Sequence, residues 1–344
     1  MPIKISGTSL RVPLILFIFM PHISSVMKKT LLSILTLLAC ISALAQESGY
    51  AVVNLSVCNL RRTPDFDAEM TTQALLGTPV HVLGKDGWYH IQTPDTYTGW
   101  VHTAGIHVMS FEEYHDWNAA EKIVITALCG LVYSAPDSKS QSISDVVGGD
   151  RLRYLGRKGR YFKVGFPDGR VGYVSRKAGM KETDWRKSVR SDAAAVIATA
   201  KTMLGFPYLW AGMSPKGMDC SGFVRTTLYM HDIIIPRDAS QQAPKGERIT
   251  IDEDFGNLLP GDLIFFGRRG EDGERDRVSH VAIYIGGKEF IHSLGSVRIN
   301  SFDPEADNYD EYDLSRLLYA SRVLPYIDRQ DGLCTTATNE YYNE

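Results

Sequence analysis

The chain has 344 residues, of which 44% are hydrophobic and 22% are charged, and its formal net charge is −3. This length exceeds what one small domain needs, and the composition is that of a globular protein with real cores. Without an excess of positive charge the chain lacks the field that holds nucleic acid or an anionic membrane, so we expect neither partner. The five cysteines form no C-x-x-C pair, which argues against a zinc knuckle or a dense disulfide framework.

The N-terminal segment has the pattern of an export signal. Lys28 and Lys29 precede an apolar run from Leu31 to Leu38, and small residues follow as far as Ala45. This is the order of regions in a secretory signal peptide, and the apolar run is shorter than the ~20 residues that span a bilayer. We therefore predict that residues 1–45 are a targeting segment without a stable transmembrane helix, and that the protein is periplasmic or extracellular.

Two questions stay open for the exported chain. Residues 37–40 resemble a lipoprotein cleavage box, so a lipid anchor at Cys40 is the alternative to soluble export, and Met27 is the expected true start. Export also places three further cysteines where disulfides can form, and their pairing stays open: Cys58, Cys129 and Cys334.

The segment after the signal contains an internal repeat. Residues after Gly77 match those after Gly149 at an offset of 72 or 73 positions. In each copy apolar residues alternate between Gly, Pro and Asp, as in short antiparallel strands joined by tight turns. We predict two small β barrels, over residues 46–118 and 119–184. The matched pairs include Leu83 with Leu155, Tyr89 with Tyr161, Pro94 with Pro167, Asp95 with Asp168, and Gly99 with Gly172.

Both copies resemble the bacterial SH3-like domain. The resemblance rests on Asn59-Leu60-Arg61 near the start of the first copy and on a Gly-aromatic-Val string at the end of each copy. It covers about residues 50–106 and 124–178. Such domains commonly bind cell-wall peptides, and a spacer that only packs against its neighbours is the alternative.

After Trp185 the alternating pattern of the two barrels ends and a helix-compatible pattern begins. Ser191 is placed to cap a helix whose alanine-rich run ends at Gly205. Cys220 comes directly before another helix-compatible stretch, so we expect its thiol at a helix N-terminus. There the unpaired N–H groups and the helix dipole lower a thiol pKa and hold an oxyanion. A buried, inert cysteine is the alternative.

Two histidines lie on predicted strands that flank a glycine-rich turn. A two-residue turn pairs Ile285 with Lys288 and puts His280 and His292 on opposite faces of the sheet. A three-residue turn pairs Ile285 with Glu289 and puts both rings on one face. We predict the three-residue turn.

Together with the cysteine, these histidines form a nucleophile, a base and a third group. His280 would take the proton of Cys220, and His292 would orient the ring of His280. The alternative for each histidine is that it only satisfies a hydrogen bond in the core.

These residues lie in sequence blocks that resemble the NlpC-type family of papain-like cell-wall cysteine peptidases. The family carries an Asp-Cys-Ser-Gly-aromatic string, a Ser-His-Val strand, and a polar third residue twelve positions after the histidine. In this chain the matching blocks are residues 219–223, residues 279–286 and His292, with two further blocks at residues 236–242 and 259–263. The resemblance therefore spans about residues 193–326.

The resemblance implies an α+β fold, with a papain-like (NlpC-type) catalytic domain over residues 185–327 preceded by the two SH3-like β barrels. A polar tail, residues 328–344, follows and carries no pattern that predicts a structure. The family usually has Trp-Gly-Gly where this chain has Trp210-Ala211-Gly212, which leaves the backbone freedom of that loop open.

The resemblance also assigns roles to side chains around the nucleophile. It places Tyr208 near the oxyanion, and Trp210 either in the site or among core aromatics. A substrate with a free ammonium group needs an anionic cleft, and Asp238 matches the family's amine-binding acid, with a structural pairing near Arg237 as the alternative. The candidate substrate-binding residues are Asp219, Ser221, Asp238, Trp210 and, from the barrels, Tyr97 and Tyr133.

Paired SH3-like domains ahead of such a peptidase resemble the γ-D-glutamyl-L-diamino acid endopeptidases. The expected activity is hydrolysis of peptidoglycan stem peptides or muropeptides with a free N-terminal L-Ala, by a monomer. No metal or other cofactor is expected, because His102 and His107 lie without a partner acid pattern. The alternatives are an N-acetylmuramoyl-L-alanine amidase and a non-catalytic cell-wall binding protein.

Overall fold

The computed structural model describes residues 49–271 and 274–344. The predicted targeting segment, with Met27 and Cys40, lies outside the described residues. Within the described ranges, no helix is long and apolar enough to cross a membrane. Four cysteines fall in these ranges, and all four carry free thiols: Cys58, Cys129, Cys220 and Cys334.

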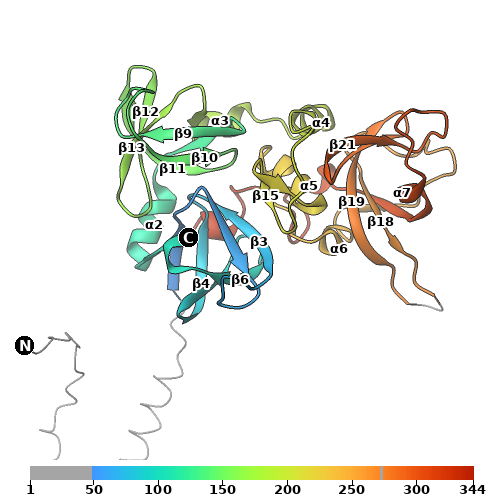
Figure 1. Ribbon diagram of the computed structural model, residues 1–344, viewed down its shortest axis with the longest axis horizontal. Coiled ribbons are helices and arrows are strands. Elements are labelled where there is room, and N and C mark those ends of the chain that lie inside the picture. Colours follow the sequence, from blue (N-terminus) through green and yellow to red (C-terminus); the bar gives the residue numbers. More distant parts are fainter. Residues whose placement is uncertain (1–48, 272–273) are drawn as a thin grey trace, which may run out of the picture. The chain divides into compact units, whose positions relative to one another are not determined.

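The first domain is a seven-stranded antiparallel barrel, followed by a helix that a Ser110–Glu113 capping box begins (Figure 1). Its strands run in the order β3-β2-β6-β5-β4-β1-β7. The elements are β1 (Gly49–Val53), β2 (Val57–Arg61), β3 (Met70–Leu75), β4 (Pro79–Asp86), β5 (Trp88–Gln92), β6 (Thr98–Val101), η2 (Thr103–Gly105), β7 (Ile106–Met109) and α2 (Phe111–Ala119).

The second domain repeats the first strand for strand. Its order is β10-β9-β13-β12-β11-β8-β14, which is the order of the first sheet with seven added to each strand number. The internal repeat is therefore confirmed as one fold used twice. The elements are β8 (Lys122–Ile125), β9 (Cys129–Tyr133), β10 (Ser142–Val147), β11 (Arg151–Lys158), β12 (Tyr161–Gly165), β13 (Val171–Ser175), β14 (Gly179–Lys181) and α3 (Glu182–Ser188).

The same local chemistry builds both barrels. Val80 and Val82 lie on either side of the more exposed His81 and fill the first core, and Leu152 fills the second. Gly77 and Gly149 precede the long central strands with φ of 81° and 95°, a conformation that L side chains rarely adopt. The repeat therefore keeps glycine at this turn in both copies.

The third domain combines helices with a six-stranded antiparallel sheet in the order β17-β22-β18-β19-β20-β21. Its helices are α4 (Ala193–Lys201), α5 (Cys220–Tyr229), α6 (Ala239–Gln242), α7 (Glu311–Ser315) and η3 (Leu324–Tyr326). Its strands are β15 (Met213–Ser214), β16 (Gly217–Met218), β17 (Glu247–Ile249), β18 (Leu263–Arg268), β19 (Arg277–Gly286), β20 (Glu289–Leu294), β21 (Ser296–Ser301) and β22 (Leu317–Arg322).

Both faces of this sheet are buried, which sets the place of the nucleophile. Leu263 and Phe265 on β18 share one core with the helices, whereas Ile264 and Phe266 fill a second core on the other face. Helix α5 packs its apolar side against the first face and so brings its N-terminus to the sheet. The predicted α+β class is thereby confirmed.

The start of α4 differs by one residue from its prediction. The cap is Asp192 and not Ser191, because the helix begins at Ala193 and the Asp192 carboxylate accepts the N–H of Ala195 at 3.0 Å. The regular helix ends at Lys201, ahead of the glycine that was expected to stop it.

The segment 328–344, for which no structure was predicted, packs against all three domains. The Tyr341 carbonyl accepts a hydrogen bond from Tyr114 of the first domain at 3.1 Å. Tyr342 bonds Tyr229 of α5 at 2.8 Å, and its ring lies 5.1 Å from the Arg151 guanidinium of the second domain. A short helix, η4 (Glu340–Tyr342), carries these tyrosines.

Candidate active site

Cys220 is the first residue of α5, as predicted from the sequence. Asp219 caps the helix, because its carboxylate accepts the N–H of Gly222 at 2.6 Å. A Cβ on Gly222 would lie 2.0 Å from the carbonyl oxygen of Gly212, so the preceding loop passes directly against the first helical turn. Glycine is therefore required for this close approach.

The two residues that flank the nucleophile are already engaged inside the protein. Arg237, which is 1% exposed, donates to the Asp219 carboxylate at 2.6 Å and to the Ser221 hydroxyl at 2.8 Å. Asp219 also accepts the N–H of Ala211 at 3.0 Å. Asp219 and Ser221 also line the cavity that holds Cys220, so their role in binding a substrate ammonium stays a prediction, with the charge of Asp219 offset by this buried guanidinium.

The histidines meet on one face of the sheet, but the turn between them differs from both predicted turns. The tight turn holds Gly287 and Lys288, and Gly286 pairs with Glu289. Ile285 is then bulged out of the ladder, so that Ile283 pairs with Ile291. The bulge restores the register that a three-residue turn would give.

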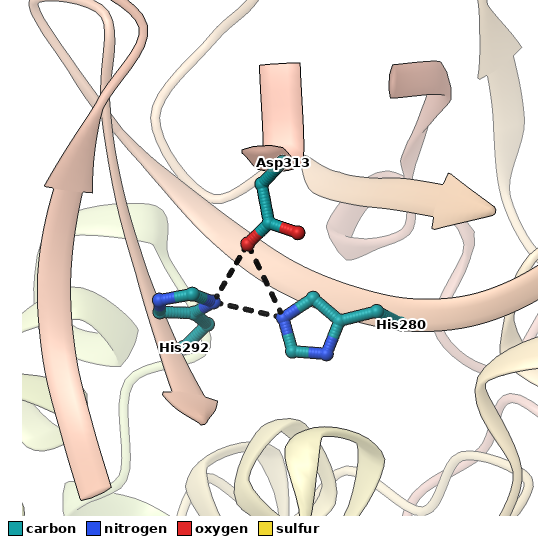
Figure 2. A group of neighbouring side chains, drawn as sticks. All are labelled: His280, His292 and Asp313. Atoms are coloured by element: carbon teal, nitrogen blue, oxygen red, sulfur yellow. Dashed lines mark hydrogen bonds and ion pairs between the residues drawn. The ribbon is translucent and has the colours of Figure 1, made fainter. Parts of the chain in front are cut away.

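Through this register the Nε2 atom of His280 lies 2.8 Å from the Nδ1 atom of His292 (Figure 2). His280 is 6% exposed and His292 is fully buried behind it. The second ring therefore contacts the first and not the solvent, as a group that orients a catalytic base must.

Cys220 and His280 line one cavity of about 560 Å³. Tyr208, Trp210 and Asp238 also line it, and so does Tyr97 from the first barrel. Tyr133 does not line this cavity and is corrected as a candidate. It lies on β9 of the second barrel, where its ring packs edge-on against Tyr161 at 6.3 Å.

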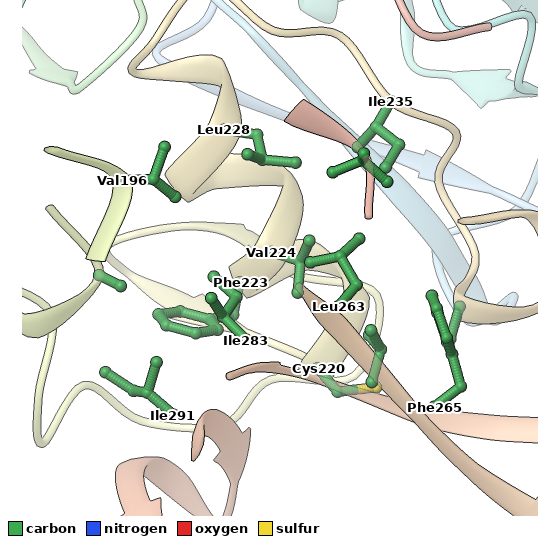
Figure 3. Packing of buried hydrophobic residues seen from close by; sticks show 14 of the residues in the cluster. Val196, Cys220, Phe223, Val224, Leu228, Ile235, Leu263, Phe265, Ile283 and Ile291 are labelled. Carbon is green, nitrogen blue, oxygen red and sulfur yellow. The ribbon is translucent and has the colours of Figure 1, made fainter. Parts of the chain in front are cut away.

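Burial sets the protonation state of the nucleophile and the base. Figure 3 shows Cys220 among buried apolar side chains, and this burial raises the pKa of its thiol to about 11. The N–H groups of Ser221 and Val281 act in the opposite direction. Burial and the neighbouring His292 lower the pKa of His280 to about 3.

Burial therefore favours the neutral thiol and the neutral imidazole in the resting site. The expectation that the helix N-terminus lowers the pKa of Cys220 is wrong, because desolvation of the thiolate outweighs the helix dipole and the N–H groups. His280 must then act as a general base that removes the thiol proton when sulfur attacks.

The two aromatic residues ahead of the nucleophile are suited to contact substrate. Burial and the nearby Cys220 raise the pKa of Tyr208 to about 12, so its hydroxyl remains a hydrogen-bond donor at neutral pH. Trp210 is 61% exposed, which excludes the alternative of a core aromatic. Its Nε1 donates to Glu69 of the first barrel at 3.2 Å.

The first barrel contributes a polar end to the cavity. Tyr97 hydrogen-bonds the Asp238 carboxylate, and burial raises the pKa of that carboxyl. Glu69 and Arg62, paired at 2.7 Å, line the same cavity. Sequence reasoning missed Glu69, and the only signal was its place in the repeat, where the second copy has Gln141.

A buried carboxylate that the sequence did not indicate lies beside the two rings. An oxygen of Asp313 is 3.6 Å from His292 Nδ1 and 4.0 Å from His280 Nε2 (Figure 2). Two imidazoles and a carboxylate are possible zinc ligands, and ligand nitrogens on one tetrahedral zinc lie about 3.3 Å apart. The 2.8 Å between these nitrogens is instead a hydrogen-bond distance.

A cysteine at a helix N-terminus, with a base from an antiparallel sheet packed on that helix, defines the papain-like class of cysteine peptidases. Within this class, a family model described as "NlpC/P60 family" matches residues 205–315. Models described as "Bacterial dipeptidyl-peptidase Sh3 domain" and "Bacterial SH3 domain" match residues 60–106 and 131–179.

Known proteins agree with these models. The chain is 33% identical over 234 residues to the gamma-D-glutamyl-L-lysine dipeptidyl-peptidase of Bacillus cereus, covering 65% of this chain and 67% of that relative. It is 28% identical over 236 residues to the Bacillus subtilis protein of the same name, covering 66% and 73%. A crystal structure of an NlpC/P60 family protein from Bacillus cereus matches with a TM-score of 0.67 at 27% identity, covering 80% of this chain and all of that one (100%).

The chain therefore belongs to the NlpC/P60 family. It is a cysteine peptidase that carries two bacterial SH3 domains, as the sequence predicted.

Proposed function

We propose that the protein hydrolyses the γ-D-glutamyl–diamino acid bond of peptidoglycan stem peptides whose N-terminal L-Ala is free. One observation carries this proposal: the cavity that holds Cys220 and His280 also holds Asp238 and the first barrel's Glu69. Glu69 pairs with Arg62 in an exposed ion pair that water screens, so its charge, together with that of Asp238, still suits a substrate with an ammonium group close to the bond that is cut. The relatives named gamma-D-glutamyl-L-lysine dipeptidyl-peptidase support the same specificity.

The reaction begins when His280 removes the thiol proton and the sulfur of Cys220 attacks the γ-glutamyl carbonyl carbon. Backbone N–H groups at the start of α5 and the Tyr208 hydroxyl donate to the oxyanion. The protonated His280 then gives its proton to the leaving amine, and a thioester to Cys220 remains. Water attacks the thioester, releases L-Ala-γ-D-Glu and regenerates the thiol.

Recognition of the free amine explains why fragments are the substrate. In intact wall the L-Ala nitrogen is acylated by the glycan's lactyl group. It is then an uncharged amide nitrogen that is attached to the glycan. Asp238, with Tyr97 bonded to it, would then face an uncharged amide and an added substituent. We therefore expect a strong preference for stem peptides that another hydrolase has already freed from the glycan.

Product analysis tests this function against its alternatives. The free tripeptide L-Ala-γ-D-Glu-diamino acid should yield L-Ala-γ-D-Glu by mass spectrometry, and the N-acetylated tripeptide should react far more slowly. The Cys220→Ala variant should bind the tripeptide, unfold at the wild-type denaturant concentration and release no dipeptide. Release of an intact stem peptide from a muropeptide would indicate the amidase instead, and binding without any cleavage would indicate a wall-binding protein.

The place of action is part of the same proposal. The signal-like pattern of residues 1–45 supports export to the periplasm or the cell exterior, with a lipid anchor at Cys40 as the alternative. N-terminal sequencing and mass measurement of the protein from its native cell envelope distinguish a free Gln46 end from an acylated Cys40.

A further inference from the structure

The hydrogen bonds of the catalytic pair continue beyond His292. Its Nε2 atom lies 3.4 Å from the amide oxygen of Asn300. The Asn300 amide nitrogen donates to one oxygen of Asp310 at 2.6 Å, and the other Asp310 oxygen accepts the N–H of Asp313 at 2.9 Å. A chain of hydrogen bonds therefore links the cap of α7 to the base beside the nucleophile.

The fold places these groups in line. His292 pairs with Arg298 across β20 and β21, so Asn300 is its diagonal neighbour on the same face of the sheet. Asp310 caps α7, and that helix presents Asp313 to the rings. Asn300 therefore lies on β21, which pairing with β20 holds in place, and Asp310 lies at the start of α7, which it caps.

This chain fixes where the imidazole hydrogens are. A carboxylate only accepts hydrogen bonds, so Asn300 must present its NH₂ to Asp310 and its oxygen to His292. That oxygen also only accepts, so the Nε2 atom of His292 carries a hydrogen. In the neutral ring the Nδ1 atom is then bare, and it accepts the hydrogen on Nε2 of His280.

This arrangement determines the protonation of the other ring nitrogen of His280, Nδ1. With its hydrogen on Nε2, the neutral ring has a bare Nδ1 atom, which is the state that a general base needs. We propose that Asn300 and Asp310 are positioning residues that hold His280 in this tautomer. The proposal rests on the cysteine peptidase chemistry of the proposed function and adds the two residues that prepare its base.

The charged groups around the rings do not select a tautomer by themselves. Arg298 and Arg316 both lower the pKa of His280, and Arg298 also lowers that of His292 while Asp310 raises it. These charges act on the whole ring. The Asp313 oxygen lies 3.6 Å from His292 Nδ1 and makes no hydrogen bond there, whereas the Asn300 oxygen is within hydrogen-bond distance of Nε2 at 3.4 Å, so the Asn300 contact selects the tautomer.

A nearly isosteric variant tests the order of the chain. In Asp310→Asn the new amide has one oxygen for two donors. If that oxygen keeps the Asp313 N–H, its NH₂ faces Asn300, which must flip and offer its own NH₂ to His292. The hydrogens then move to Nδ1 of both rings, and we expect kcat to fall at least about tenfold with KM unchanged.

The reciprocal exchange is the matched control. In the double variant Asn300→Asp/Asp310→Asn, the carboxylate at position 300 accepts from both His292 and the new amide, so the original tautomers return. The double variant has the composition of the wild type and should regain most of the lost kcat. If the pair had only a structural role, the double variant would be no better than the single one, and that result would overturn the proposal.

NMR of the ¹⁵N-labelled ring nitrogens reads the tautomers without activity. The wild type and the double variant should show both rings with the hydrogen on Nε2, and Asp310→Asn should show it on Nδ1. A wild-type His280 with its hydrogen on Nδ1, or an Asp310→Asn variant whose rings carry the hydrogen on Nδ1 without any loss of kcat, would contradict the proposal. If the wild type cleaves none of the tripeptides, the proposed function fails while the NMR result still decides the tautomers.

Discussion

The two SH3 barrels have the same strand order, yet only the first lines the catalytic cavity. Glu69 and Tyr97 face that cavity from the first barrel. The repeat places Gln141 and Arg170 at the corresponding positions of the second barrel. The duplicated scaffold is therefore not a duplicated site, and a few side chains between strands decide which copy meets substrate.

The second barrel does not line the cavity but contacts helix α5. Its Arg151 is buried, with the guanidinium 5.0 Å from the ring of Tyr229 on α5 and 5.3 Å from that of Trp185. The first barrel has Pro79 at the corresponding position, which offers no such contact. Both copies therefore contact the helix that bears the nucleophile, the first through Asp95 and the second through Arg151, and only the first also lines the cavity.

The largest difference should appear in stability, at a matched pair of aspartates. Asp95 of the first barrel is fully buried in an ion pair with Arg225 of α5 at 3.0 Å. Asp168, its counterpart, pairs with Arg170 at the surface. Because Asp95→Ala leaves a largely buried guanidinium unpaired, its side chain only 12% exposed, we expect a loss of about 3–5 kcal/mol in the free energy of unfolding.

The Asp168→Ala variant should lose only about 1 kcal/mol, because water already screens its pair with Arg170 and its second partner, Asn54 of the first barrel at 2.9 Å, forms an exposed hydrogen bond. Urea denaturation of both variants measures the contrast. Equal losses would show that the first barrel is not anchored to α5 through Asp95.

The next effect should be on catalysis. Tyr97→Ala removes the hydroxyl that bonds Asp238 and opens the polar end of the cavity, so we expect kcat/KM for the free tripeptide to fall about 10–100-fold. Arg170→Ala, at the corresponding position, should leave kcat/KM unchanged. An equal fall in both variants would mean that the barrels act through stability and not through the cavity.

A smaller effect should follow from the carboxylate on the first barrel. Glu69→Gln keeps the shape and an acceptor for Trp210 but removes the charge, so KM should rise by about two- to tenfold with kcat unchanged. The control is Gln141→Glu, which adds a charge at the corresponding place and should not change KM. A change in kcat for Glu69→Gln would place this residue in the chemical step.

The smallest effect should be a shift in a pH profile. Burial raises the pKa of the Asp238 carboxyl, so this group becomes neutral as the pH falls and KM should rise. The value of kcat should hold further into acid, because the pKa of His280 is lowered to about 3 and the base stays unprotonated.

The Tyr97 hydrogen bond lowers the pKa of Asp238. Tyr97→Phe should therefore move the rise in KM to higher pH, whereas Arg170→Ala should not move it. Initial rates between pH 4 and pH 8 measure the pH dependence of KM and that of kcat. A fall in kcat centred near the ordinary histidine pKa of about 6.5 would contradict the lowered pKa of His280.

Sequence reasoning found what is encoded over short stretches. The repeat, the N-terminal position of Cys220 and the pairing of two histidines all follow from local patterns and strand periodicity. The direction of the thiol pKa was wrong, because a helix N-terminus can be predicted from residues near the cysteine whereas burial depends on elements far along the chain.

The groups that were missed come from segments that meet only in the folded chain. Asp313 lies beyond the last family block and reaches the rings through α7. Hydrogen bonds link Asn300 to His292 and Asp310 to Asn300. In the segment 328–344 apolar residues do not recur at the spacing of a helix or a strand. Its buried residues are isolated side chains such as Tyr341, which contacts Tyr114 of the first domain.

The bulge at Ile285 limits how this hairpin can change over time. Surface turns usually accept gained or lost residues, because nothing beyond them depends on their count. Here the extra residue decides which side of the sheet the second imidazole occupies, since a one-residue slip inverts every side chain that follows. A deletion in this turn would leave the two barrels unchanged, but it would exchange the core positions of Phe290 and Ile291 and turn His292 away from His280. The length of this connection should therefore vary less among descendants of this gene than that of ordinary surface turns.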